Sequence, residues 1–472
     1  MLFGATSAKA GNVTVEQAKS VAAHFMGSRM GIDKLTPDQL TLVYQIDNPD
    51  MNIPAAYFFN LESCGWVVIA GTTVIDPIVA YNDEGSLVVD QLPANMLYWM
   101  EGYAGMISDI QKADAENNYS DHAMWKALSS SNVKGTRGDQ VILMNERWDQ
   151  GDERNPTYNL YCPKVGNRWS MVGCVATALA QICHYYKYPV RPTGSHFYWW
   201  EGDGGSTRLA LNYDTMYFDY TLMPNRVTST SQPAKIREVA KLSYALGVAI
   251  NMNYHPDGSG AHSDDVPDAM ESYFKYQHSN LISRSNTYNF VERIRGAVEE
   301  RHPVYMSATS TTGSGADAAG HAFIVAGYET GDAAGSEYNY YYFNWGWDGA
   351  GNGFYNLGEN DMPIAQQYGG YNFIRNQRAI VNLLPPADTL GICSVDPTVL
   401  GHAYPNPAAF SVKVPYSTQT AADLMVYSID GKMVESVRVQ PGDGEVVVRV
   451  DALPKGVYIY RLNSQSGKFV VQ

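Results

Sequence analysis

The sequence predicts an α+β protein built from a small N-terminal unit, a large middle unit and a C-terminal β-sandwich. In the middle unit, residues 141–385, helical spacing of apolar residues comes first and strand-like stretches follow. That order is typical of an α+β fold with a helical half and an antiparallel sheet half. Residues 11–115 mix helices with short strands, and residues 390–472 contain only short alternating strands separated by turns, as in a β-sandwich of Ig-like size.

The composition is that of a globular protein and argues against a nucleic-acid partner. The 472 residues are 45% hydrophobic and 17% charged, with a net charge of −15, whereas nucleic acids and anionic membranes select basic surfaces. No apolar run reaches the ~18 residues of a transmembrane segment. The five cysteines, at positions 64, 162, 174, 183 and 393, form no CxxC pair, which argues against a zinc site. We expect no metal and no cofactor.

The first ten residues are interpreted as the remnant of a signal peptide. Ala8-Lys9-Ala10 fits the small-x-small rule for cleavage before Gly11, although the charged and long apolar parts of a signal peptide are missing. A short disordered leader is the alternative. Because the cysteine count is odd, at least one thiol is free within the monomer. In a secreted protein, such an unpaired cysteine is a candidate reactive thiol.

Residues 11–115 are predicted to form the small N-terminal α+β unit. Apolar residues at helical spacing predict helices over residues 14–30 and 92–113. The strands predicted between them cover residues 40–45, 55–61, 64–70 and 77–81. This unit contains no catalytic set, and its single cysteine, Cys64, is expected to be structural.

Residues 116–140 are predicted to be a linker that contains the activation cleavage site. The stretch is polar and irregular, and Lys134-Gly135 and Arg137-Gly138 are candidate cleavage points, because exposed polar segments are preferred sites of proteolysis. A plain inter-domain linker is the alternative.

The middle unit is predicted to contain four helices followed by a sheet. The helices cover residues 173–188, 236–251, 265–276 and 291–301. The strands cover residues 303–308, 320–328, 338–343, 353–355 and 379–384. Asp430-Gly431 is a hairpin turn in the C-terminal unit, whose strands are predicted over 411–415, 424–428, 445–450 and 457–462.

Cys174 is the candidate nucleophile because it lies in the first turn of its helix. The apolar residues that follow recur at helical spacing and Pro189 ends the run. The unpaired N–H groups of a helix start favour an ionised thiol, which is the nucleophilic form of cysteine. A buried cysteine that packs as a small hydrophobic residue would look the same in sequence, so a base from elsewhere in the chain has to decide between the two.

His321 is the histidine that we expect to supply this base. It follows a Gly/Ala/Ser-rich loop and opens an apolar strand, which places its ring at a strand edge. A structural histidine is the alternative. His184 is the rival, but it follows Cys174 by ten residues, or ~15 Å along the same helix, too far to reach back.

A Cys–His pair also needs an oxyanion donor and a group that orients the imidazole. Gln150, in a Trp-flanked turn before the nucleophile, is the candidate donor; a solvated turn residue is the alternative. Asn344, Trp345 and Trp347 follow His321 on the next strand, and antiparallel pairing would bring that corner near the ring. The two tryptophans could equally serve core packing.

The motifs in the middle unit resemble the streptopain family of papain-fold cysteine peptidases. Residues 173–181 (GCVATALAQ), 320–323 (GHAF) and 344–349 (NWGWDG) carry the likeness. The segment before the nucleophile, with Trp148-Asp149-Gln150, Pro156 and Tyr158-Asn159, resembles that family as well.

The resemblance implies a role for each of these residues. Cys174 is the implied nucleophile, His321 the general base and later the general acid, and Gln150 with the backbone N–H of Cys174 the oxyanion hole. In this family the NWGW corner takes the place of the orienting asparagine of papain-like enzymes. Either the Asn344 side chain or the Trp345 backbone carbonyl, with a Trp stacked on the ring, could orient His321.

The implied substrate contacts are Gly260 and Gly320. The family often has Ser where this chain has Gly260.

Residues 11–115 resemble the inhibitory propeptide of the same family, through the stretches 59–71, 83–85 and 92–95. The resemblance implies a zymogen whose propeptide obstructs the cleft as an intramolecular inhibitor. The tail resembles the C-terminal sorting domain of the type IX secretion system, through residues 404–407, 430–432 and 453–458. It implies export from a Gram-negative bacterium by that machinery, to the cell surface or the medium; an adhesive β-sandwich is the alternative.

We therefore expect a secreted, self-processing cysteine endopeptidase that hydrolyses peptide bonds of proteins or peptides through a thioester acyl-enzyme. Two other functions stay open. The same Cys–His dyad could transfer acyl groups to amines, or the protein could be a catalytically silent binding protein.

Overall fold

The computed structural model describes most of the chain. The residues that it leaves out are 1–10, 32–34, 63, 93, 118, 130–135, 203, 288, 310–319, 334–335, 358–376, 387–398, 419–420, 430–431 and 463–464. The predicted signal remnant, Lys134-Gly135, Cys393 and the Asp430-Gly431 turn lie outside the described residues. The chain forms two compact units, Met1–Pro386 and Ala387–Gln472, and each is considered by itself.

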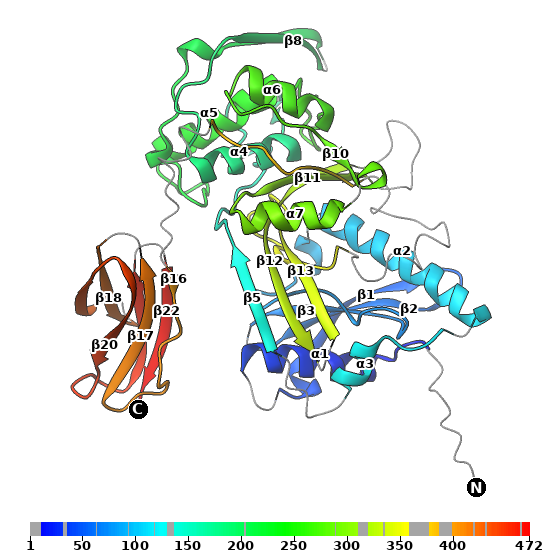
Figure 1. Ribbon diagram of the computed structural model, residues 1–472. Coiled ribbons are helices and arrows are strands. Elements are labelled where there is room, and N and C mark those ends of the chain that lie inside the picture. Colours follow the sequence, from blue (N-terminus) through cyan, green and yellow to red (C-terminus); the bar gives the residue numbers. More distant parts are fainter. Residues whose placement is uncertain are drawn as a thin grey trace. The chain divides into compact units, whose positions relative to one another are not determined.

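The N-terminal part of the first unit is an antiparallel sheet covered by helices (Figure 1). Its elements are α1 (Val15–Met30), β1 (Leu40–Asn48), β2 (Ile53–Leu61), β3 (Trp66–Ala70), β4 (Ile78–Asn82), α2 (Ala94–Asn117) and α3 (Ala123–Leu128). The start of α1 is fixed by a capping box, in which the Thr14 hydroxyl and the Gln17 side chain each accept a backbone N–H of the other residue. Gly31 ends the helix in the left-handed conformation.

The rest of the first unit has a helical half and a sheet half. The helices are α4 (Cys174–Tyr186), α5 (Pro233–Ala249), α6 (Val266–Ser272) and α7 (Phe290–Glu299). The strands are β5 (Thr136–Ile142), β6 (Lys164–Val165), β7 (Arg168–Trp169), β8 (Ser195–Gly202), β9 (Gly205–Asn212), β10 (Ile282–Ser283), β11 (Val304–Thr309), β12 (Gly320–Ala333), β13 (Ser336–Asn344), β14 (Gly353–Tyr355) and β15 (Arg378–Ile380).

One continuous sheet joins the two halves of the predicted zymogen. Its strand order is β1-β2-β3-β4-β14-β13-β12-β11-β15-β10, and β5 also pairs with β12. The junction is the antiparallel pair β4–β14, in which Tyr81 lies opposite Phe354. The sheet of the N-terminal region therefore continues into the sheet that contains His321.

The apolar core is also shared across this junction. Trp99 on α2 packs edge-on against Phe323, Phe343 and Trp345, with ring centroids 5.8, 5.2 and 6.0 Å away. These residues belong to one buried cluster that also includes the inner face of α1. The N-terminal region therefore folds onto the sheet half as part of the same core.

A buried ion cluster ties α1 to β12. The Arg29 guanidinium makes a bidentate pair with Glu329, one contact being 3.0 Å, and donates to Asp83 at 2.9 and 3.1 Å. It also lies 4.1 Å from the Tyr81 ring centroid. Burial alone would lower the pKa of Arg29, but Tyr81, Glu329 and Asp83 together raise it well above its ordinary value. Arg29 therefore carries its positive charge within the core, where the carboxylates of Glu329 and Asp83 balance it.

The second unit is a β-sandwich, as predicted from its alternating strands. A three-stranded sheet has the order β16-β17-β20 and a four-stranded sheet the order β19-β18-β21-β22. The strands are β16 (Val399–Leu400), β17 (Ser411–Thr418), β18 (Ala422–Ser428), β19 (Met433–Val439), β20 (Gly442–Arg449), β21 (Gly456–Leu462) and β22 (Gln465–Val471). Inward-facing Val412, Val426, Val448 and Phe469 form part of its core, because every second residue of a strand points to the same face.

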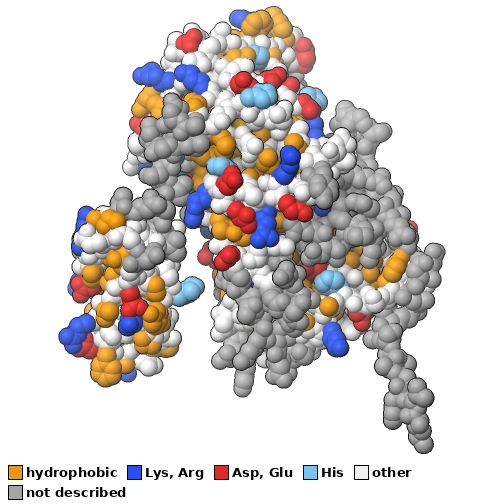
Figure 2. Space-filling view, viewed as in Figure 1, with side chains coloured by type: hydrophobic (Ala, Val, Ile, Leu, Met, Phe, Trp, Pro, Cys, Tyr) orange, Lys and Arg blue, Asp and Glu red, His pale blue; other side chains and the backbone are white. Residues whose placement is uncertain are grey.

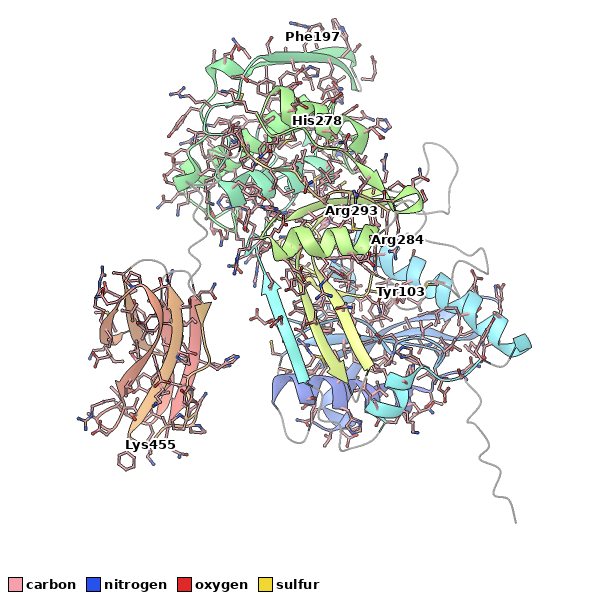
Figure 3. The ribbon with its side chains drawn as sticks, in the orientation of Figure 1. Tyr103, Phe197, His278, Arg284, Arg293 and Lys455 are labelled. Carbon is pink, nitrogen blue, oxygen red and sulfur yellow. The ribbon has the colours of Figure 1, made fainter. Side chains whose placement is uncertain are left out.

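Several described elements were not predicted from the sequence, among them the hairpin β8–β9, helix α3 and strand β5. The hairpin β8–β9 has an outer face with Phe197 51% and Trp199 62% exposed, and Phe197 lies at the outer edge of the helical half (Figure 3). Helix α3 falls within the predicted linker, residues 116–140, and strand β5 overlaps its end. Strand β5 forms by pairing with β12, Ile142 opposite Gly327, a long-range contact that local sequence does not reveal.

The surface has mixed charge. Acidic and basic side chains are interspersed over the helical half in the face drawn in Figure 2. None of the described helices is long and apolar enough to cross a membrane.

Candidate active site

The turn before α4 presents Cys174 at the helix start. Gly173 precedes the helix with φ of +86°, a conformation that L-residues rarely adopt. A Cβ atom there would lie 2.7 Å from the end of the Met252 side chain and 3.0 Å from the Ser259 carbonyl. The packing of the 252–259 segment against this turn therefore requires glycine immediately before Cys174.

The Cys174 sulfur lies beside the strand that contains His321. Helix α4 packs on β12, and the backbone N–H groups of Ala322, Val175 and Cys174 itself favour the ionised form of the thiol. Burial nevertheless raises the pKa of the Cys174 thiol, and these N–H groups oppose the rise only in part. The expected preference of a helix start for thiolate is present but is outweighed here, so the thiol is protonated in this form.

His321 is buried at the beginning of β12. Its Nε2 lies 3.1 Å from the Trp345 carbonyl oxygen, and since a carbonyl only accepts, Nε2 carries the proton. The Phe323 ring lies parallel to the imidazole at 6.3 Å, and the Trp345 ring is tilted at 6.1 Å. Burial lowers the pKa of His321 to about 3, so the ring is neutral and Nδ1 has its lone pair available.

The Asn344 side chain is used in holding the corner together. Its Nδ2 donates to the Glu146 carbonyl at 2.7 Å and to Gln181 Oε1 at 3.0 Å, while its Oδ1 accepts the Gly346 N–H at 3.1 Å. Of the two predicted orienting groups, the Trp345 carbonyl is therefore the one in contact with His321. Gln181 Oε1 also lies 3.4 Å from the Trp148 N–H.

Gln150 is tied to the segment before the nucleophile. Its carbonyl accepts the N–H of Val172 at 2.9 Å, two residues before Cys174, and the residue is 5% exposed. This hydrogen bond between Gln150 and Val172 anchors the turn that contains Gln150 next to the start of α4.

The two predicted substrate contacts flank the same region. Gly260 forms an antiparallel bridge with Asn253, with backbone hydrogen bonds of 2.8 and 3.2 Å, next to the Ser259 carbonyl that touches the Gly173 turn. Gly320 opens β12 opposite Thr309 on β11.

The two remaining side chains considered from the sequence are Trp347 and His184. The Trp347 indole N–H is buried without a hydrogen-bond partner among the described residues. His184 is buried farther along α4, where its Nδ1 contacts Glu146 at 2.6 Å, which agrees with its exclusion as the base.

Comparison with known proteins identifies the three parts of the chain. Residues 148–355 match the peptidase C10 family, residues 10–107 match the Spi protease inhibitor family, and residues 402–472 match the secretion system C-terminal sorting domain. The middle of this chain is a peptidase C10 domain. It is thus a cysteine peptidase domain, preceded by an inhibitor propeptide. The sorting domain indicates type IX secretion to the medium or the cell surface.

Two characterised relatives and one solved structure agree with this assignment. The chain is 25% identical over 439 residues to the thiol protease/hemagglutinin PrtT of Porphyromonas gingivalis, covering 89% of this chain and 48% of PrtT, or about half its length. It is 25% identical over 348 residues to streptopain of Streptococcus pyogenes, covering 70% of this chain and 80% of streptopain. A prointerpain A fragment from Prevotella intermedia has the same fold, with a TM-score of 0.54, 24% identity, and coverage of 72% of this chain and 97% of the fragment.

The propeptide of the C10 domain reaches the corner that holds His321. Trp99 contacts the ring of Trp345, as described above, and the Met96 sulfur lies 2.4 Å from where a Cβ of Gly351 would be. Helix α2 therefore packs directly behind the segment whose carbonyl accepts from His321.

Sequence reasoning did not assign a role to Gln181, although the residue belongs to the motif after Cys174. Gln181 is fully buried and connects α4 to both Trp148 and Asn344. The available indication was its spacing: position 181 is seven residues, or two helical turns, after Cys174 and so lies on the same face. Among the described residues, no group of three or more His, Cys, Asp or Glu side chains could hold a metal ion.

Proposed function

We propose that this chain is a latent cysteine endopeptidase in which Cys174 and His321 form the catalytic dyad. The observation that carries the proposal is that helix α4, which begins at Cys174, packs on strand β12, which contains His321, so that the Ala322 N–H beside His321 favours the ionised Cys174 thiol. The His321 ring is fixed through Nε2 by the Trp345 carbonyl, and its Nδ1 is the atom that can take a proton.

In the proposed reaction, His321 Nδ1 takes the proton of the Cys174 thiol as the sulfur attacks the peptide carbonyl carbon. The tetrahedral oxyanion is stabilised by the Gln150 side-chain amide and the backbone N–H of Cys174, since preorganised donors act on charge that develops in the transition state. The imidazolium then gives its proton to the departing amine, and a thioester remains. Water, deprotonated by His321, hydrolyses the thioester and restores the thiol.

The two pKa shifts support a resting state that is catalytically inactive. A neutral thiol beside an imidazole with a pKa of about 3 does not form the thiolate–imidazolium pair that makes such a dyad reactive. Both shifts come from burial, and Trp99 of the propeptide helix α2 packs against Phe323 and Trp345, whose rings lie beside His321. We infer that removal of the propeptide opens the site to water and restores the reactive pair.

The proposal is tested by maturation of the purified protein. Wild type, Cys174→Ala and the control Cys183→Ala are incubated, and their fragments are mapped by mass spectrometry. Cys183 lies on the same helix but is fully buried, and burial raises its pKa to about 12. We expect wild type and Cys183→Ala to be cut within residues 116–140 and to cleave casein, and Cys174→Ala to stay intact. Maturation of Cys174→Ala at the wild-type rate, or a wild type without Cys174-dependent cleavage, would overturn the proposal.

A further inference from the structure

Asp149 lies directly before Gln150, and the reaction described above gives its carboxylate no role. We infer that Asp149 is a positioning residue for the oxyanion hole: its carboxylate holds the main chain of Gln150 so that the Gln150 amide faces the reacting carbonyl. The inference rests on the proposed function of Gln150 and extends it to a residue that does not touch the substrate.

The geometry fixes the Gln150 peptide from two sides. Asp149 Oδ1 accepts the N–H of Gln150 at 2.6 Å, and the N–H of Gly151 also favours the ionised carboxylate. On the other side, the Gln150 carbonyl accepts the N–H of Val172 at 2.9 Å. Asp149 thus accepts the N–H of Gln150, and Val172 donates to the Gln150 carbonyl. Loss of the Asp149 carboxylate therefore removes the hydrogen bond on the N–H side of Gln150.

The chain after Gln150 is held by a different residue. Gly151 has φ of +95°, and a Cβ there would lie 2.1 Å from Asn159 Oδ1. The buried Asn159 side chain donates to the Asp152 carbonyl at 2.9 Å and to the Ser170 carbonyl at 3.1 Å. Because Asn159 fixes the turn from residue 151 onward, removal of the Asp149 carboxylate is expected to act on Gln150 without unfolding the turn.

The charges around Asp149 come from several segments of the C10 domain. Asp348 and Asp152 face it with like charge, Tyr158 lies on the same side, and Arg226 pairs with Asp348 in a bidentate contact. Burial, with Asp348 and Asp152, raises the pKa of Asp149 to about 6, although the N–H groups of Gln150 and Gly151 oppose the rise. All these groups lie within residues 148–355, so the arrangement does not depend on the propeptide.

The consequence is a pH-dependent oxyanion hole. An ionised carboxylate only accepts and can take both N–H groups, whereas a protonated one turns one oxygen into a donor. As the pH falls through about 6, Asp149 takes up a proton, the hold on Gln150 weakens and kcat falls. An asparagine would keep one acceptor and would not titrate.

The experiment compares processed wild type, Asp149→Asn, Asp149→Ala and the control Glu153→Gln, with kcat and KM measured on a peptide substrate from pH 4.5 to 8. Glu153 belongs to the same turn but pairs outward with Arg168. Each variant is processed with a trace of wild type, which is then removed. The rate of Cys174 alkylation is measured in parallel as a check on the nucleophile.

We expect Asp149→Ala to lose ~10–100-fold in kcat, below the ~100–1,000-fold for complete loss of an oxyanion donor, with KM and Cys174 alkylation unchanged. Asp149→Asn should recover part of the kcat and lack the step near pH 6 that wild type and Glu153→Gln show. A step that persists in Asp149→Asn, or a loss that appears in KM or in alkylation, overturns the inference. A wild type without Cys174-dependent cleavage defeats the proposed function instead.

Discussion

The buried pair between Arg29 and Glu329 makes a quantitative prediction about how the propeptide is held. The side chains are 3% and 0% exposed, so replacing Arg29 by Met leaves the Glu329 carboxylate in the core without its cationic partner, beside the Gln140 amide 2.9 Å away. Removing one partner of a buried ion pair costs about 3–5 kcal/mol. Asp83 is 25% exposed and stays solvated, so we assign the cost mainly to Glu329.

The assay is urea unfolding of the full chain in the Cys174→Ala background, which prevents self-cleavage. We expect Arg29→Met to lower the unfolding free energy of the first unit by about 3–5 kcal/mol. The control Arg154→Met, whose ion pair with Glu153 is formed by an arginine that is 84% exposed, should change it by less than about 1 kcal/mol.

The double variant Arg29→Met/Glu329→Gln separates the pair from its surroundings. Because the uncompensated charge is gone, we expect the double variant to be more stable than Arg29→Met alone, with a coupling of about 1–3 kcal/mol. With Cys174 intact, Arg29→Met should also mature faster. The reasoning would be refuted if Arg29→Met and Arg154→Met had the same unfolding free energy. It would also be refuted if the destabilisation of the double variant equalled the summed destabilisations of Arg29→Met and Glu329→Gln.

Three further predictions concern the site and its cover. Trp99→Ala should speed maturation and cost about 3–5 kcal/mol, because it removes the ring that packs on Trp345; the cleavage time course and urea unfolding check this. Gly173→Ala should abolish casein cleavage, because its Cβ would meet Met252 and the left-handed turn costs ~1–2 kcal/mol; Cys174 alkylation measures the displacement. The folded pKa of Asp149, about 6, is above its unfolded value, so its contribution to stability is present below pH ~4 and lost as the pH rises through ~6. Asp149→Asn should therefore be about 1–3 kcal/mol more stable than its parent at pH 7.5 and equal at pH 4, as followed by unfolding at both pH values.

The sequence was sufficient where local pattern decides structure. The helix that starts at Cys174 and the strand that opens with His321 follow from apolar spacing and from Gly173 and Pro189 as boundaries. The sequence left Asn344 and Trp345 as alternatives for the group beside His321, because the contacts of Asn344 with Glu146 and Gln181 are long-range.

The features that escaped prediction are long-range. Arg29 and Glu329 are 300 positions apart, and neither lies in a motif. Strand β5 overlaps the predicted linker, and the pairing with β12 that forms it joins residues far apart in the sequence. The domain limits, including the activation site within 116–140, stay predictions, and so do the roles assigned to the site residues.

The shared sheet has a consequence for the protein after maturation. When the propeptide leaves, β14 (Gly353–Tyr355) loses its neighbour β4 and becomes an edge strand with unpaired backbone groups. Phe354 also loses the Tyr81 ring, which is stacked 5.3 Å from it. Exposed edge strands promote association with other chains, and an edge strand of three residues provides few backbone groups for such pairing. Because β14 is only three residues long, loss of its partner strand β4 exposes a sheet edge that is too short to favour self-association of the mature enzyme.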